Sequence, residues 1–273
     1  MISNDRNTLH EQYHRQGYCV VRGFTSRVDT TKIYSRIEKY SLRNANPNSI
    51  LIYPPSLPRF FDFRLYRSHS FKLTGIKPAL SLLKALGSPK MSIIKRSLDL
   101  KRCSRVDSYF SSIGTKEIIR WHCDQAFGGA TDPGIYFNGN KGLVSISPIN
   151  KFFHYLTDVG PENGALCYIP GSNHIGSAIR TSINHGLINY RPFLDLRDAI
   201  DIVANHREAL TSTGKVTPEA IRIFLEQSDT ALSNSNSYAI SASAGDLVIF
   251  NDLGYHMGSA PRNSRRLVAR YFF

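Results

Sequence analysis

Two histidines and one aspartate in this sequence have the types and spacing of a metal site. His122 and Asp124 stand two residues apart, so on an extended segment the imidazole and the carboxylate share one face and can grip one ion. His256 follows a turn and a short apolar run at 244–250, and basic residues come soon after it. Two imidazoles and one carboxylate on one side of a metal leave the opposite positions open, which suits Fe(II) and the activation of O2.

The ligand types alone leave other interpretations open. A His-x-Asp pair occurs by chance in many proteins, and a zinc hydrolase would use the same kinds of ligand. The four cysteines lack Cys-x-x-Cys spacing, which argues against a zinc knuckle or a disulfide framework and favours reduced thiols. One of them, Cys123, lies between two candidate ligands and is expected to point away from the metal.

Segments along most of the chain resemble the phytanoyl-CoA dioxygenase-like family of Fe(II)/2-oxoglutarate oxygenases in their order and spacing. They are residues 17–24, 121–125, 164–172 and 244–250, and His256 with the Gly258-Ser259 pair. The resemblance implies a mainly β fold with flanking helices, whose core is a double-stranded β-helix, a cupin-like jelly-roll of two sheets. It also implies that iron is held at one mouth of this barrel by His122, Asp124 and His256.

In the family pattern, 2-oxoglutarate chelates the iron through its 1-carboxylate and 2-keto oxygen, and an arginine on the last core strand binds its far carboxylate. Arginine suits this task because its planar fork can make two charge-assisted hydrogen bonds. When residues 265–272 are matched to the last core strand of the family, Arg265 takes the position of this arginine. Leu267 and Ala269 are then expected on the same inward face. Arg266 is the alternative if the register slips by one residue. Ser259, in a His-Gly-Ser motif stretched by one residue, is carried over as a contact of the co-substrate.

The reaction that the resemblance implies is hydroxylation of an unactivated C–H bond of a small molecule, with O2 consumed and succinate and CO2 released. Asp124 bears on this outcome, because halogenating relatives have a small residue in its place to admit halide. Two alternatives stay open: the same oxygenase chemistry on a nucleic acid or protein, and a non-catalytic barrel that binds a ligand. The intact triad and the candidate arginine argue against the second.

Short strands are expected to position these residues. Apolar runs bounded by turn residues predict about eight strands, and their number favours a barrel or a double sheet. They lie at 91–94, 108–113, 143–149, 152–156, 165–169, 238–242, 247–250 and 267–273. We expect one domain over 1–273, with residues 1–90 as an apron of helices and a strand and residues 91–273 as the jelly-roll core.

The strand series is interrupted at 180–237, where helical patterns occupy 194–210 and 218–225. We expect this insertion to cover the mouth of the barrel as a lid, with help from the loop at 44–60, because loops on a rigid scaffold generally carry specificity. Each arginine of this insertion could bind an acidic group of the substrate, or it could lie on a solvated helix face. These arginines are Arg180, Arg191, Arg197 and Arg207. His154 is expected to be a satisfied core or pocket residue.

The 273 residues carry a formal net charge of +13 and have a pI near 9.7, so the surface attracts anions. The basic residues are spread along the chain, so nucleic acid is not favoured over an anionic small-molecule substrate or a merely solvated basic face. No window approaches the roughly 18 apolar residues of a membrane span, and the N-terminus does not resemble a signal peptide. We therefore expect a cytoplasmic protein without a membrane partner; the sequence leaves the oligomeric state open.

Overall fold

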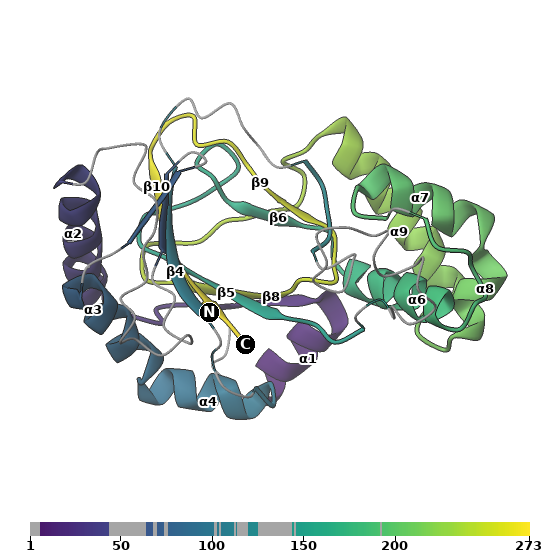
Figure 1. Cartoon of the computed structure of the whole chain (residues 1–273), viewed down its shortest axis with the longest axis horizontal. Helices are drawn as coiled ribbons and strands as arrows, with labels where there is room; N and C mark the ends of the chain where they lie inside the picture. Colours follow the sequence, from purple (N-terminus) through teal and green to yellow (C-terminus); the bar gives the residue numbers. More distant parts are fainter. Residues whose placement is uncertain are drawn as a thin grey trace.

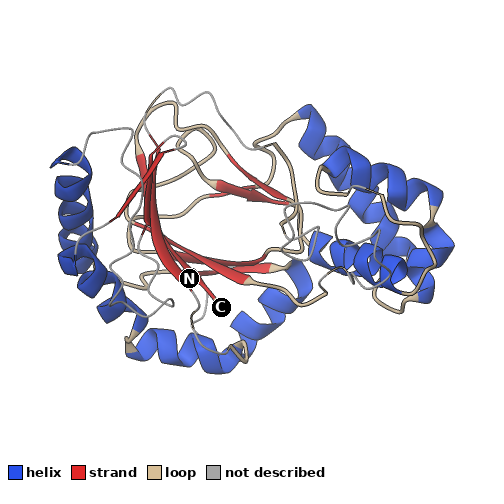
Figure 2. Cartoon of the chain, in the orientation of Figure 1, coloured by secondary structure: helices blue, strands red, loops and turns tan. Residues whose placement is uncertain are grey.

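Two β-sheets form the centre of the structure, and a group of helices lies on either side of them (Figures 1 and 2). The structure is a computed structural model of the chain. It describes residues 6–43, 64–67, 70–73, 76–100, 103, 105–111, 113, 120–124, 144, 146–191 and 193–273. The expected loop at 44–60 lies outside these ranges.

The larger sheet has seven strands in the described part of the chain. Their order is β1 (Tyr18–Val21), β8 (Leu247–Asn251), β5 (Asn150–Tyr155), β10 (Arg266–Phe272), β4 (Arg105–Ser111), β2 (Arg64–Arg67) and β3 (Ser70–Leu73). The β2–β4 pair is parallel, and the other pairs are antiparallel. Strands distant in sequence therefore lie side by side, as β1 and β8 do.

The smaller sheet has three antiparallel strands, in the order β7 (Ala239–Ile240), β6 (Leu166–Tyr168) and β9 (His256–Gly258). The segment that carries His122 adds to its edge through a β-bridge to His256. From β4 onward the chain repeatedly crosses between the two sheets: residues 120–124 follow β4, β6 follows β5, and β9 follows β8. Each crossing brings a new segment to the space between the sheets.

Four helices flank the larger sheet: α1 (Arg6–Gln16), α2 (Arg27–Arg43), α3 (Ile76–Leu86) and α4 (Pro89–Ser97). The apolar run at 91–94 belongs to α4, so the strand predicted there is wrong. Ser88 caps this helix by accepting a hydrogen bond from the Met91 amide, and Pro89 stands in the first turn, where its missing N–H removes no bond. Met91 and Ile94 are buried three residues apart on one helical face, a spacing that so short a run does not reveal.

The helical block beside the smaller sheet contains α6 (Ser172–Asn184), α7 (Leu196–Asn205), α8 (Arg207–Ser212) and α9 (Pro218–Ser233). It begins earlier than the expected insertion at 180–237, and the helical pattern at 194–210 corresponds to two helices. Thr217 caps α9 by accepting a hydrogen bond from the Ala220 amide, with Pro218 in the first turn, as its sequence predicts. The helix continues beyond the predicted end at 225.

Three hydrophobic clusters join these layers. One lies between the two sheets and includes Tyr155 and Phe250, the second joins the larger sheet to α1–α4, and the third joins the smaller sheet to α6–α9. Neighbouring residues of β10 alternate between the first two clusters: Val268 points between the sheets, whereas Leu267 and Ala269 point toward the helices. The face on which a strand residue lies therefore decides whether it can line a site between the sheets.

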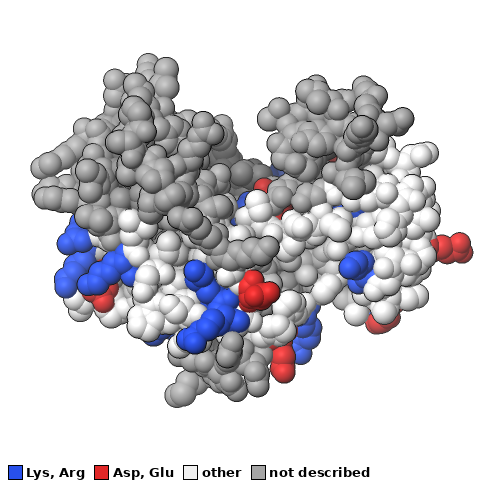
Figure 3. Space-filling model, turned by 60° about the horizontal axis from the view of Figure 1, so that its bottom comes forward, with Lys and Arg blue, Asp and Glu red and all other residues white. Residues whose placement is uncertain are grey.

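On the described part of the surface in Figure 3, blue Lys and Arg residues are interspersed with red Asp and Glu residues. Uncharged areas lie between these groups. This distribution agrees with basic residues that are spread along the sequence. Within the described ranges, no helix combines the length and the apolar character needed to cross a membrane.

Candidate active site

His122, Asp124 and His256 come together in the space between the sheets. Their potential ligand atoms all lie within 4.8 Å of one another, and no other cluster of this kind is found among the described residues. The Nε2 atom of His256 is 3.0 Å from Oδ2 of Asp124, and the Nε2 atom of His122 is 3.8 Å from Oδ1. The structure thus brings all three predicted metal ligands to one point.

Backbone pairing explains how residues so distant in sequence meet. The amide of His122 donates to the carbonyl of His256 at 3.0 Å, and the amide of His256 donates to the carbonyl of His122 at 2.8 Å. The amide of Asp124 donates to the carbonyl of Asp252 at 3.0 Å, in the turn that precedes β9. Both ends of the His-x-Asp segment are therefore fixed to the segment that carries the third ligand.

The two imidazole rings are oriented for binding a cation. Nδ1 of His122 lies 2.8 Å from the carbonyl of Arg120, and Nδ1 of His256 lies 2.8 Å from the carbonyl of Gly254. A carbonyl only accepts, so each Nδ1 carries a proton, and each Nε2 is the ring atom that faces Asp124 and is available to a metal. This donor set, two imidazole nitrogens and a carboxylate, fits a divalent transition metal such as Fe(II).

The protonation states agree with this donor set. Burial and the neighbouring His256 lower the pKa of His122 to about 4, so its ring is neutral at neutral pH. Burial would raise the pKa of the Asp124 carboxyl, but Lys151 and the two histidines outweigh burial and hold this pKa well below its ordinary value. A neutral imidazole and an ionised carboxylate are the forms that bind a metal.

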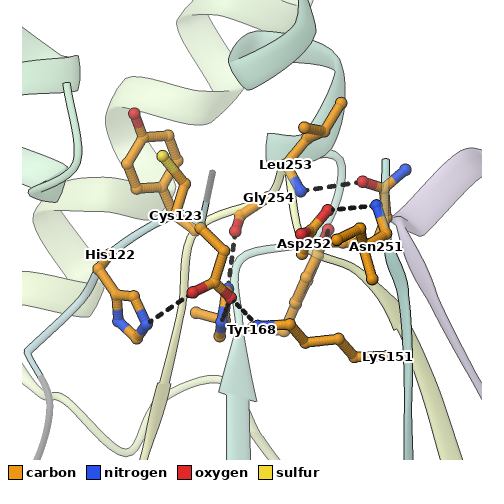
Figure 4. A network of polar contacts seen from close by, with 12 residues as sticks. His122, Cys123, Lys151, Tyr168, Asn251, Asp252, Leu253 and Gly254 are labelled. Atoms are coloured by element: carbon orange, nitrogen blue, oxygen red, sulfur yellow. Dashed lines mark hydrogen bonds and ion pairs between the residues drawn. The ribbon is translucent and has the colours of Figure 1, made fainter. Parts of the chain in front are cut away.

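The triad opens into a cavity of about 190 Å³ between the sheets. Besides the triad, its walls include Ser259 and Arg266, which were predicted from the sequence, and Lys151 and Arg270, which were not. Cys123 points away from the cavity, as expected, into the helical block, where its thiol contacts the carbonyl of Phe193 (Figure 4). Side chains therefore alternate along this segment: His122 and Asp124 point into the cavity, and Cys123 points into the hydrophobic core behind it.

Arg266, and not Arg265, reaches this cavity. Arg265 lies on the outer side of the larger sheet, where its guanidinium is 2.9 Å from Glu38 of α2 and its side chain is 50% exposed. The expected face, with Arg265, Leu267 and Ala269 pointing inward, is thus wrong by one residue. The strand pairs Arg266 with Ser111 of β4, and this register turns Arg266 into the space between the sheets.

The Arg266 side chain is held in place by neighbouring backbone and side-chain oxygens. Its Nη1 donates to the carbonyl of Gly164 at 2.5 Å, and its Nη2 donates to the hydroxyl of Ser111 at 3.0 Å. Gly164 has a φ of +78°, and a Cβ there would lie 2.9 Å from Cδ of Arg266. Ser259 is buried in the same wall, with its hydroxyl 3.3 Å from the carbonyl of Gly160.

The helical block does not form the expected lid over this cavity. Among its described residues, none from 180–237 lines the cavity. The block packs on the outer face of the smaller sheet instead, where the indole N–H of Trp121 donates to the carbonyl of Ala231 at 3.1 Å. Trp121 and Cys123 are buried against it because they alternate with His122 and Asp124 and lie on the opposite face of the segment.

Two further expectations are settled by burial. Arg180 is fully buried, so neither a substrate contact nor a solvated helix face describes it. His154 is a satisfied core residue: it is fully buried under the larger sheet, where Nε2 is 2.8 Å from Oγ1 of Thr25 and Nδ1 is 3.3 Å from the hydroxyl of Tyr271.

Lys151 is, with Arg270, one of the two charged residues at the site that sequence reasoning missed. It pairs with Asp124 and lines the cavity together with Phe153 and Arg270. The alternation of β5 could have indicated it, because Lys151 and Phe153 share a face opposite to the core residues Phe152 and His154. A single lysine at the start of an aromatic strand carries no signal of function by itself.

Comparisons with known proteins agree with this geometry. A family model described as Phytanoyl-CoA dioxygenase (PhyH) matches residues 13–268. Similar solved structures include the non-heme alpha ketoglutarate dependent carbocyclase SnoK from nogalamycin biosynthesis, with 16% identity, a TM-score of 0.54, and coverage of 97% of this chain and 82% of that chain. The epimerase SnoN, in complex with Fe3+, alpha ketoglutarate and nogalamycin RO, has 13% identity, a TM-score of 0.54, and coverage of 98% and 82%.

A third similar structure is HygX from Streptomyces hygroscopicus with nickel and 2-oxoglutarate bound, with 14% identity, a TM-score of 0.51, and coverage of 96% of this chain and 85% of that chain. No curated protein gives a significant match. At these identities the likeness to the solved structures is one of fold.

Proposed function

Because the chain belongs to the phytanoyl-CoA dioxygenase family and is therefore an Fe(II)/2-oxoglutarate-dependent oxygenase, we propose that it hydroxylates a C–H bond of a small molecule and releases succinate and CO2. The observation that carries the proposal is the cavity in which His122, Asp124 and His256 share one wall region with the anchored guanidinium of Arg266. A guanidinium near three metal ligands suits a co-substrate that binds a metal at one end and carries a carboxylate at the other.

The metal ligands in this proposal are His122, Asp124 and His256. Bound Fe(II) supplies the activation of O2 and the oxidation of 2-oxoglutarate. The protein contributes the position of the ligands: the carbonyls of Arg120 and Gly254 fix the two imidazole rings, and the β-bridge between His122 and His256 fixes their backbones.

Arg266 is the group that binds the far carboxylate of 2-oxoglutarate in this proposal. A Cβ built on Gly258 would lie 3.4 Å from Nη1 of Arg266, so the guanidinium lies beside Gly258. Gly258 is two residues from His256 on the same face of β9, and two residues of a strand span about 6.6 Å. This spacing suits a five-carbon dicarboxylate with one end near His256 and the other at Arg266, and Ser259 lies next to the same path.

The arrangement of strands supports a double-stranded β-helix as the core. In such a jelly-roll, strands enter two facing sheets alternately, as 120–124, β6 and β9 do relative to β4, β5 and β8. We propose that residues 1–273 form a single domain and that the stretch of chain from β4 to β10 forms its core. We assign α6–α9 to a block that supports the smaller sheet from outside.

The anionic ligand Asp124 favours hydroxylation in this proposal, since it occupies a metal position that a halide would need. Titration of the anaerobic protein with Fe(II) and then 2-oxoglutarate tests the site, because chelation of iron by a 2-keto acid produces a visible charge-transfer band. We expect the band in the wild type and in Asp201→Ala, a change on the exposed surface, and its loss in Asp124→Ala.

Turnover then tests the reaction. Small molecules screened with Fe(II), 2-oxoglutarate and O2 should include one that stimulates succinate formation and gains one oxygen atom by mass spectrometry. A substrate that instead loses two hydrogens, closes a ring or inverts a centre would keep the oxygenase class and replace hydroxylation as its outcome. Tight zinc binding with hydrolysis and without a response to 2-oxoglutarate would contradict the proposal.

A further inference from the structure

Lys151 places a positive charge directly on the carboxylate of the proposed metal ligand Asp124. Its ammonium forms an ion pair with Oδ2 of Asp124, the oxygen that also lies 3.0 Å from Nε2 of His256 (Figure 4). The Lys151 side chain is 18% exposed and projects from the start of β5 into the cavity. The ammonium and a metal ion would therefore share one carboxylate.

Charge balance shows what a bound metal does to Lys151. The two charges of a divalent ion are matched by the two carboxylates of 2-oxoglutarate, and the charge of Arg266 is matched by that of Asp124. With the metal, the co-substrate and these residues in place, the described lining residues leave no formal counter-charge for the ammonium of Lys151. A positive charge beside a bound metal ion is unfavourable unless an anion lies next to it.

Position separates Lys151 from the co-substrate arginine. Lys151 is opposite Phe272 at one end of the pairing between β5 and β10, whereas Arg266 is at the other end of β10. Phe272 and Arg266 are six positions apart along the strand, which corresponds to about 20 Å of backbone. The ammonium of Lys151 contacts Asp124, whereas the guanidinium of Arg266 lies beside Gly258, two residues beyond His256. An anion at Lys151 would therefore lie next to Asp124, away from the far carboxylate of 2-oxoglutarate at Arg266.

The surroundings of Lys151 are apolar and aromatic. Its Nζ lies 5.8 Å from the ring centroid of Phe272, and Phe153 and Phe250 also line the cavity. The guanidinium of Arg270 lies 5.6 Å from the centroid of the same Phe272 ring, which adds positive potential to this side of the cavity. Among the described lining residues, Asp124 is the one acidic side chain. An acidic group with an apolar remainder fits these walls.

We infer that Lys151 binds an acidic group, a carboxylate or a phosphate, of the primary substrate beside the metal. The inference rests on the proposed function and adds to it a substrate class and the residue that selects this class. In the metal-free protein the ammonium of Lys151 pairs with Asp124. When the substrate binds, the ammonium turns to the substrate anion, and this new ion pair replaces the one with Asp124.

Metal affinity gives the first test, with Co(II) as the probe and no co-substrate. Lys151→Met should bind Co(II) more tightly than the wild type, because the ammonium no longer competes for Oδ2 of Asp124. Lys84→Met, a change of an exposed lysine on α3, is the matched control and should bind Co(II) as the wild type does. Weaker Co(II) binding in Lys151→Met would show that the lysine supports Asp124 as a metal ligand, and would overturn the inference.

Anion binding gives the second test, with inorganic phosphate and acetate as probes of the Co(II) and 2-oxoglutarate form. The cobalt absorption spectrum should respond to one of these anions in the wild type, and its affinity should fall about tenfold or more in Lys151→Met, since a hydrogen bond between charged groups is lost. Lys151→Arg should retain much of the affinity. No response in the wild type, or an equal affinity in Lys151→Met, would overturn the inference.

The co-substrate gives the third test, because its own 1-carboxylate is the other anion near the metal. The affinity of the Co(II) form for 2-oxoglutarate should change by less than about threefold in Lys151→Met, which is under 1 kcal/mol. A loss as large as that seen for phosphate or acetate would assign the lysine to the co-substrate and overturn the inference. If the wild type binds neither Co(II) nor 2-oxoglutarate, the proposed function itself fails.

Discussion

Arg180 donates a 2.6 Å hydrogen bond from Nη2 to the backbone carbonyl of Asp124. The side chain of Arg180 is fully buried in α6; its Nη1 also donates to the carbonyl of Gly176 at 3.1 Å, and its guanidinium lies 5.1 Å from the ring centroid of Phe193. These carbonyl oxygens and the face of the aromatic ring stabilise the buried positive charge of the guanidinium. The helical block thus holds the backbone of a proposed metal ligand from behind the cavity.

Replacement of Arg180 should loosen the metal site more than it changes the fold around it. Arg180→Met removes the hydrogen bond to Asp124 while it keeps a long apolar side chain, and loss of such outer support typically costs about 10-fold to 100-fold in metal affinity. Co(II) titration measures this effect, and Arg180→Lys should recover part of the affinity.

The matched control for this change is Ser182→Ala, which removes another buried hydrogen bond from α6, to the carbonyl of Ala209, away from the metal ligands. Both variants should lower the melting temperature, but only Arg180→Met should weaken Co(II) binding. Equal metal affinities in the two variants would show that Arg180 contributes to stability alone.

Arg266 and Arg265 should differ strongly in their effect on the co-substrate. Arg266→Met removes the cation in the cavity, and an unpaired carboxylate there costs about 2 kcal/mol or more, which is about 30-fold in the dissociation constant of 2-oxoglutarate. Arg265→Met removes only the half-exposed ion pair with Glu38, so this constant should stay within about twofold of the wild type. Calorimetry on the Co(II) form measures both values, and the reverse ranking would contradict the observed register of β10.

The sequence predicts which three residues meet at the candidate metal site, because their signal is local. His122 and Asp124 share a face through simple alternation, and His256 stands directly after a turn and an apolar strand. Six of the predicted strands also appear as β4, β5, β6, β7, β8 and β10, since each combines an apolar run with turn residues at its ends. β9 is not predicted, because its three residues end in Gly258 and are too few to show a pattern.

The sequence does not predict which face of β10 turns inward. Arg265 and Arg266 differ by one residue, both faces of the strand are covered by other elements, and both therefore carry apolar residues. The position of the helical block fails for a related reason. Its helical periodicity shows that one face of each helix is buried, but it does not show whether that face packs on the outside of the smaller sheet or over the cavity.

Gly164 should be needed for the placement of Arg266. A Cβ at this position meets Cδ of Arg266 at 2.9 Å, and the residue also has a positive φ of 78°. Gly164→Ala should therefore lower the free energy of unfolding and weaken 2-oxoglutarate binding at the same time, since the guanidinium has to shift. Chemical denaturation and calorimetry measure the two effects.

Gly214→Ala is the control for backbone strain in this comparison. Gly214 has a φ of +68° in the helical block, and nothing lies within 4 Å of a Cβ built there. Its replacement should cost only the strain of a left-handed residue, about 1 kcal/mol, and should leave co-substrate binding unchanged. If Gly164→Ala also affects stability alone, then contact with Gly164 does not position the guanidinium.

His154 should make the stability of the protein depend on pH below neutrality. Burial lowers the pKa of this histidine to about 3, although Asp246 acts in the opposite direction, whereas the unfolded chain keeps a value near 6.5. At pH values above 6.5 the ring is neutral in both states, and its full contribution to stability is present. As the pH falls from 6.5 toward 3, the unfolded chain takes up a proton that the folded protein does not, so stability is lost over this window.

The change of His154 to glutamine tests this dependence, because glutamine is polar, of similar size and does not titrate. Between about pH 7 and pH 4.5, the wild type should lose about 2 to 3 kcal/mol of unfolding free energy through His154, and His154→Gln should lose less by that amount. Urea denaturation of the metal-free protein at each pH measures the difference, with His10→Gln on the exposed side of α1 as the control. Parallel curves for the wild type and His154→Gln would show that the buried ring takes up its proton without unfolding.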